Sequence, residues 1–124
     1  SGKSKEYYTD LTDIAREYLE GQFSIEAIEM TSDEILEKVK KLNLNDNVYK
    51  KLRETLATAD LVKFAKANPD SSQNEIAFNN INTFVEESYV FHQELERQKE
   101  EEAKAKKHKI EEQASENQET EETK

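Results

Sequence analysis

Apolar residues recur at three- and four-residue steps along four stretches of the chain, which is the spacing that places them on one face of an α-helix. The pattern predicts helices over about residues 5–20, 32–42, 46–66 and from 72 to beyond 95. Residues 23–30 nearly alternate apolar and polar side chains, a run too brief to decide between an extended connector and a short helical turn. No stretch alternates for long enough to build a sheet. We therefore expect an all-α class, a compact four-helix domain with helix 4 extending into a charged, fraying C-terminal tail.

Residues at the ends of these stretches have the chemistry of helix caps. The segments Thr31–Glu34 and Ser72–Glu75 each match the capping-box pattern, in which a hydroxyl and a glutamate satisfy free backbone amides at the start of a helix. Asn45 or Asp46 can cap the third helix. Gly21 directly follows the first helix and is placed for the left-handed conformation that often ends one.

Apolar residues are concentrated in the first three quarters of the chain. Residues 5–95 contain 38 of the 42 hydrophobic residues and all ten aromatic residues. A segment with as few apolar side chains as residues 96–124 cannot offset the entropy lost when it becomes ordered. We therefore expect a helical domain over residues 5–95, followed by a charged helix extension that frays between 100 and 112 and ends in a disordered acidic tail. Residues 1–4 are expected to be a linker, because Ser1-Gly2 without an initiator Met is typical of a remnant of an expression tag.

Acidic residues outnumber basic ones by 28 to 18, which gives a formal net charge of −10. This balance argues against general binding to DNA, RNA or anionic lipid, because phosphate contacts need clustered cations. A short basic run over residues 104–109 is flanked by glutamates that cancel most of its field, so we interpret it as a solvated helix end. The absence of cysteine excludes disulfides and thiolate chemistry. No apolar run approaches the roughly 20 residues that span a bilayer, and no signal peptide is recognised.

Few residues in the chain suggest a chemical site. His92 and Glu96 are four residues apart and could face one metal ion, but one such pair is half a site, and we interpret it as a surface pair. Tyr7, Tyr8 and Tyr18 could form a recognition surface, although core packing with hydroxyls at the boundary is favoured. The carboxylates lie mostly opposite the apolar stripes, as on a solvated face. We therefore predict that the protein is not an enzyme, with no catalytic, cofactor-binding or metal-binding residue and no cofactor.

A family resemblance is carried by residues 6–36, which read EYYTDLTDIAREYLEGQFSIEAIEMTSDEIL. This run resembles the cytosolic C-terminal domain of Bacteroidetes single-pass membrane proteins encoded beside the Bat aerotolerance and MoxR-ATPase operon, which has a pattern like YYTxLTDxLRxYIExRFxIxAxEMTxDEI. Later stretches over 59–66 and 84–86 also look like the family. The chain departs from the pattern at Ala15, where a larger apolar residue is usual, and at Gly21-Gln22, where a charged pair is usual.

The resemblance implies the tail of a membrane-anchored protein on the cytoplasmic face of the bacterial inner membrane, without a described catalytic motif. Its partners would be proteins, with Bat-operon or MoxR-ATPase components as candidates. The membrane would be reached only through a segment absent from this chain. Our leading hypothesis is a non-enzymatic protein-interaction domain that docks an exposed helix face or groove onto such a partner.

The alternative is a helix-turn-helix-like nucleic-acid-binding regulatory domain, built on the helices over 32–42 and 46–66 and their connection at 43–45. The net charge of −7 over residues 1–95 opposes it, so we expect no nucleic-acid partner. A hydrolase or transferase ranks third.

Overall fold

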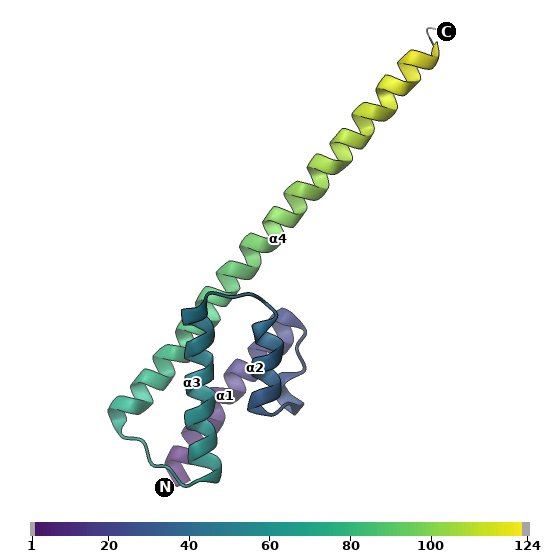
Figure 1. The fold of residues 1–124 in the computed structure, drawn as a ribbon. Helices are drawn as coiled ribbons and strands as arrows, with labels where there is room; N and C mark the ends of the chain where they lie inside the picture. The colour runs from purple at the N-terminus through teal and green to yellow at the C-terminus, as the bar shows by residue number, and fades with distance from the viewer. Residues whose placement is uncertain (1, 123–124) are drawn as a thin grey trace. The chain divides into compact units, whose positions relative to one another are not determined.

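The structure, a computed structural model, describes residues 2–122 (Figure 1). Its elements in chain order are α1 (Gly2–Phe23), η1 (Ala27–Glu29), α2 (Ser32–Lys40), α3 (Asp46–Phe64) and α4 (Ser71–Glu122), where η1 is a 3₁₀ helix. The prediction of an all-α class with four helices is confirmed, and the described residues contain no strand. The segment after α1 combines the two conformations that its sequence left open, with irregular chain over 24–26 and the η1 turn after it. Over residues 2–122, no helix has the length and apolar character needed to cross a membrane.

The chain divides into two compact units, the first ending at Tyr89 and the second beginning at Val90, whereas the sequence suggested a boundary at residue 95. The N-terminal residues belong to the first unit. Helix α1 starts at Gly2, and the buried Ser4 donates its hydroxyl to Asn68 Oδ1 at 3.0 Å. The linker expected over residues 1–4 is therefore helical from Gly2 onward, while Ser1 lies outside the described residues.

The predicted capping box at the start of α2 is confirmed. The Glu34 backbone N–H donates to Thr31 Oγ1 at 3.3 Å, and the Thr31 backbone N–H donates to Glu34 Oε1 at 3.2 Å. The Thr31 backbone N–H and the Thr31 hydroxyl, which donates to Glu34 Oε1 at 3.0 Å, lower the pKa of the Glu34 carboxyl, because they favour its ionised form. Local sequence thus sets where α2 begins.

The sequence predicted the cap of α3 correctly and the cap of α4 wrongly. Asn45 caps α3 as expected, with its Oδ1 accepting from the Asn47 N–H at 2.8 Å. The box predicted at Ser72–Glu75 is wrong, because the reciprocal bonds form at Asp70–Gln73, at 2.8 and 2.9 Å. Aspartate caps a helix about as well as serine, so the residue pattern alone did not separate the two positions. Helix α4 therefore starts at Ser71.

The end of α1 also differs from the prediction that Gly21 forms a left-handed cap. Gly21 lies within the helix, and Ser24 takes the left-handed conformation instead, with φ of 57°. The helix continues because Phe23 packs against the core and makes an edge-to-face contact with Tyr18, with ring centroids 5.8 Å apart. Tertiary packing of one aromatic ring thus moves the turn three residues along the chain.

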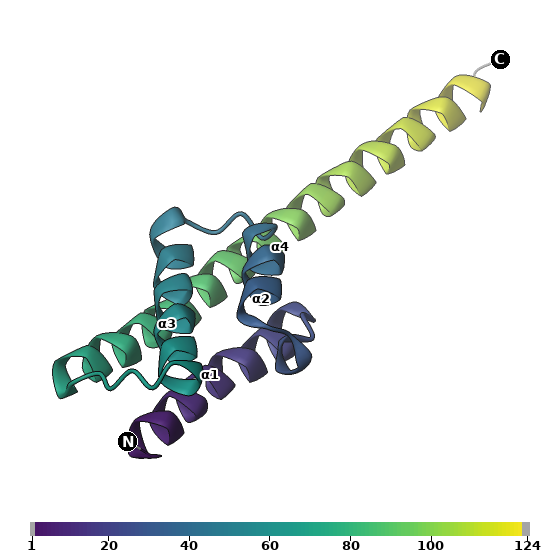
Figure 2. The same ribbon diagram turned by 60° about the horizontal axis from the view of Figure 1, so that its bottom comes forward.

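The first unit has one hydrophobic core. Helix α3 packs against both α1 and α2, and these two contacts hold the three helices together around the core (Figure 1, Figure 2). The first part of α4 adds a buried face that includes Phe84, which has no exposed surface. The buried apolar side chains are Tyr8, Leu11, Ala15, Leu19, Ile25, Ala27, Ile35, Val39, Leu44, Val48, Leu52, Leu56, Ala59, Val62, Ala77, Ile81 and Phe84.

Tyrosine side chains of α1 connect this helix to α4. The Tyr8 hydroxyl donates to Asn74 Oδ1 at 3.0 Å, and the hydroxyls of Tyr18 and Ser88 are 2.8 Å apart. Ser88 Oγ also donates to the Phe84 carbonyl at 2.6 Å, which leaves the Tyr18 O–H to donate to Ser88. Burial is the main cause of the raised pKa of both phenols, because it disfavours their ionised form. These two tyrosines are therefore core residues with hydroxyls at the boundary.

Arg16 fastens the η1 turn to α1. Its guanidinium Nη1 donates to the carbonyl oxygens of Ala27 at 2.7 Å and of Met30 at 2.5 Å. Charged donors make short, strong bonds to such acceptors, so this side chain fixes the path of the chain between α1 and α2. In the sequence Arg16 stood out only as a position matching the family pattern.

The second unit, residues 90–124, is described as helix through Glu122, past the window of 100–112 where we expected fraying and past Ala114, where disorder was expected. Ion pairs follow its surface: Arg97 pairs with Glu94 and Glu101, both at 2.5 Å. The Arg97 pairing lowers the pKa of the Glu94 carboxyl. Such i,i+3 and i,i+4 pairs each add a few tenths of a kcal/mol to helix stability. A prediction of order from apolar content alone does not include this contribution.

Candidate interaction surfaces

The residues considered for chemistry from the sequence do not assemble into a reactive site. Over residues 2–122, no group of three or more His, Asp or Glu side chains could hold a metal ion, so His92 and Glu96 gain no third ligand there. Tyr7 is the most exposed of the three α1 tyrosines, and its hydroxyl donates to the Asn74 carbonyl at 3.1 Å. The tyrosines are thus engaged with α4.

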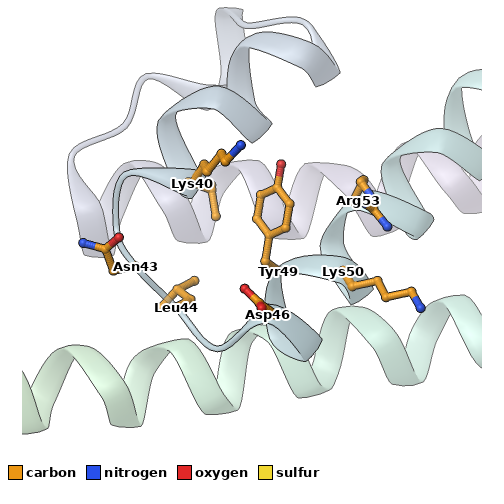
Figure 3. Close-up of a pocket in the computed structure, with 8 residues that line it drawn as sticks. Lys40, Asn43, Leu44, Asp46, Tyr49, Lys50 and Arg53 are labelled. Carbon is orange, nitrogen blue, oxygen red and sulfur yellow. The ribbon is translucent and has the colours of Figure 1, made fainter.

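The first unit has a pocket of about 420 Å³ at the corner where α2 leads into α3 (Figure 3). We call it the corner pocket. Tyr49 stands at its centre, between Lys40 of α2 and Arg53 of α3, with Lys50 and Asp46 beside it (Figure 3). Its lining residues are Val39, Lys40, Asn43, Leu44, Asp46, Tyr49, Lys50 and Arg53.

Helix packing builds this pocket in advance of any ligand. Val39 on α2 and Val48 and Leu52 on α3 are buried in the core, which fixes the two helices. In the connection between them, Asn43 has a φ of 58°. Asparagine adopts this left-handed conformation more readily than most residues. The corner pocket is therefore a feature of the folded unit.

Charge is strongly segregated around the corner pocket. Residues 38–53 contain six of the 18 basic residues and one of the 28 acidic residues of the chain. This stretch therefore carries +5, while the remaining residues together carry −15. Averaged over residues 1–95, the net charge of −7 conceals this basic cluster. A window of about 16 residues would have found it.

A second depression runs between α3 and the first part of α4, with a volume of about 420 Å³. We call it the α3–α4 groove. Ile76 lines it and is 55% exposed, whereas Thr55 and Ala77 in its lining are buried. Its polar lining consists of amide, hydroxyl and one carboxylate side chain, from Glu54. The arrangement offers an apolar contact in a polar frame.

A third, smaller hollow of about 180 Å³ lies at the end of α1 and η1, where Glu20, Glu26 and Glu29 surround the exposed Ile28. This hollow therefore places three carboxylates around one apolar side chain.

Comparison with protein-family models, curated proteins and solved structures found no match to this chain. The corner pocket and the α3–α4 groove are therefore interpreted from their own geometry and charge.

Proposed function

We propose that this chain is a non-enzymatic protein-interaction domain. The observation that carries the proposal is the exposure of large apolar side chains on α3 and the first part of α4, beside a complete core: Leu61, Phe64, Ile76 and Phe78 are 55, 82, 55 and 52% exposed. Burying a side chain of this size in an interface contributes about 1.5–3 kcal/mol. Ile76 also lines the α3–α4 groove, which offers a place for such a contact.

The resemblance over residues 6–36 supports a location and a set of partners. By that resemblance, we propose that the chain is the cytoplasmic part of a membrane-anchored bacterial protein of the inner membrane. Candidate partners are the components of the Bat operon and its MoxR-type ATPase. Docking would use the helical surface of the first unit, with no reaction of its own.

The proposal is tested by binding of purified candidate partners to the immobilised chain. We expect saturable binding of at least one neighbour-encoded protein, weakened at least about tenfold by Ile76→Glu. Ile14→Glu is the matched control, because Ile14 on α1 is 54% exposed, against 55% for Ile76, and lies outside the groove. If no candidate binds the chain, and none copurifies with the protein from cells, the proposal fails.

A helix-turn-helix-like nucleic-acid-binding regulatory domain is the second candidate, and one observation favours it. The basic cluster of residues 38–53 lies on α2, α3 and their connection, the helix pair that such a reader presents to DNA. The remaining charge of −15 opposes it, because duplex DNA extends far beyond one basic corner. A gel shift with duplex DNA at low salt tests this candidate directly, since non-specific binding is strongest there.

A further inference from the structure

We propose that the corner pocket binds a short acidic peptide segment of a partner protein. This inference rests on the proposed function and adds the chemistry of the partner segment. It concerns a surface separate from the α3–α4 groove, with which the corner pocket shares no lining residue.

The cations of the corner pocket are available to a ligand. Over residues 2–122, Lys40 and Arg53 have no ion-pair partner, while Lys50 has only Glu54, at 4.0 Å. An exposed pair at that distance is weak and readily exchanged for another carboxylate. Asp46 is the single acidic residue in the lining. The pocket therefore has a surplus of positive charge within a strongly acidic protein.

Helix stability alone does not account for this cluster. Lys40 lies in the last turn of α2, where a cation interacts favourably with the helix dipole. Lys50 and Arg53 lie in the N-terminal half of α3, nearer the positive end of its dipole, so the dipole gives no reason for their charge. Both residues line the corner pocket together with Lys40, and Lys40 and Arg53 lie on opposite sides of the Tyr49 ring (Figure 3).

The chemistry of the lining suits a peptide with carboxylate and apolar side chains. The Arg53 guanidinium can hold a carboxylate through two parallel bonds, and Lys40 provides a second positive charge on the other side of Tyr49. Val39, Leu44 and the half-buried Tyr49 ring supply apolar surface between these charges. Tyrosine rings commonly anchor peptides in this way, with an apolar body and a polar tip.

A peptide fits the charge distribution better than nucleic acid or membrane. At physiological ionic strength, salt screens the field of each charge beyond about 8 Å. A short segment seated in the pocket therefore interacts mainly with the cations there. A nucleic acid strand or an anionic bilayer extends across many such lengths and also meets the rest of the first unit, where residues 1–37 and 54–89 together carry −11. A compact acidic ligand can use Lys40, Lys50 and Arg53, which outnumber the single carboxylate of Asp46 in the lining, without opposing that larger negative charge.

The test is fluorescence anisotropy of the full chain with a labelled synthetic peptide in which glutamate alternates with leucine and phenylalanine. A peptide of the same length with lysine in place of glutamate is the negative probe. We expect saturable binding of the acidic peptide that weakens as salt is raised, and no binding of the basic one. Lys40→Glu and Arg53→Glu should each weaken binding by about tenfold or more.

Lys5→Glu is the matched control, because it makes the same charge change at an exposed position on α1 and should weaken binding by less than about threefold. Circular dichroism checks that each variant is folded, and Lys40→Gln and Arg53→Gln provide milder variants that should weaken binding in the same order. Absence of saturable binding, or an equal effect of Lys5→Glu, overturns the inference. Tighter binding of a single-stranded DNA or of phosphatidylserine vesicles, with the same dependence on Lys40 and Arg53, assigns the pocket to another anion and overturns it too.

Its failure is distinguishable from failure of the proposed function. If a partner protein binds through Ile76 while the Lys40 and Arg53 variants bind it normally and the peptide does not bind, only the corner-pocket inference fails. If the peptide binds but no partner protein does, the corner pocket stands as a peptide site and the proposed partners fall.

Discussion

Replacing Gly21 by alanine should stabilise the first unit, although the sequence pattern predicts the opposite. Gly21 lies inside α1, its φ is not positive, and a Cβ atom added there meets nothing within 4 Å. Glycine in a helix is less favourable than alanine by about 0.5–1 kcal/mol, because it loses more backbone freedom on folding. With no clash to offset this gain, we expect Gly21→Ala to raise the free energy of unfolding by that amount. If Gly21 instead formed a left-handed cap, alanine would cost about 1–2 kcal/mol.

The assay is thermal and urea denaturation, followed by near-ultraviolet circular dichroism of the core tyrosines. For a unit of this size, the gain corresponds to a rise in Tm of roughly 2–8 °C. Ser24→Gly is the companion variant, because Ser24 holds the left-handed conformation at φ of 57°, and glycine should relieve the strain there by about 0.5–1 kcal/mol. A fall in Tm for Gly21→Ala would refute both the placement of the turn at Ser24 and the reasoning from it.

Other side chains give further tests of the fold. Arg16→Met removes two charge-assisted bonds from a half-buried guanidinium, so we expect a loss of about 2 kcal/mol in urea unfolding and faster amide exchange in η1, whereas Arg16→Lys should recover part of it. Thr31→Ala breaks the capping box and should lower the free energy of unfolding by about 1 kcal/mol. Phe84→Ala leaves a cavity at a position with no exposed surface and should lower the free energy of unfolding in urea by about 3–5 kcal/mol. Burial raises the pKa of Tyr8 and Tyr18 above 10.0, so the folded state holds these protons more tightly. Their contribution is complete below pH 10 and is lost as pH rises through the folded-state values, which urea midpoints between pH 8 and about 11.5 will show.

The sequence located the helices well where helical periodicity or a capping bond between neighbouring residues decides the structure. The apolar stripes at 35, 39, 48 and 52 became buried faces, because a helix with one apolar side can only bury that side. Thr31 and Asn45 cap their helices as expected, since each bond joins residues two or three positions apart. The all-α class followed from the same local periodicity.

The candidate surfaces were less accessible from the sequence. The basic cluster was present in the letters of residues 38–53, but its meaning depends on the turn at Asn43, which brings Lys40 of α2 and Arg53 of α3 to the same tyrosine. Likewise, Ile14 and Ile81 are both apolar residues within the predicted helices, yet packing buries Ile81 and leaves Ile14 exposed.

The amino-acid sequence by itself therefore determined the number and class of helices, most of their starting points and the apolar richness of the first unit. Tertiary structure alone decided that Ser24 and not Gly21 ends α1, that Arg16 holds η1, that Tyr18 bonds to Ser88, and that a cationic pocket forms between α2 and α3. The physical reason is the separation along the chain over which each interaction acts. Periodicity and capping act within one or two helical turns, whereas these contacts join groups 11 to 70 positions apart or depend on the direction in which two packed helices meet.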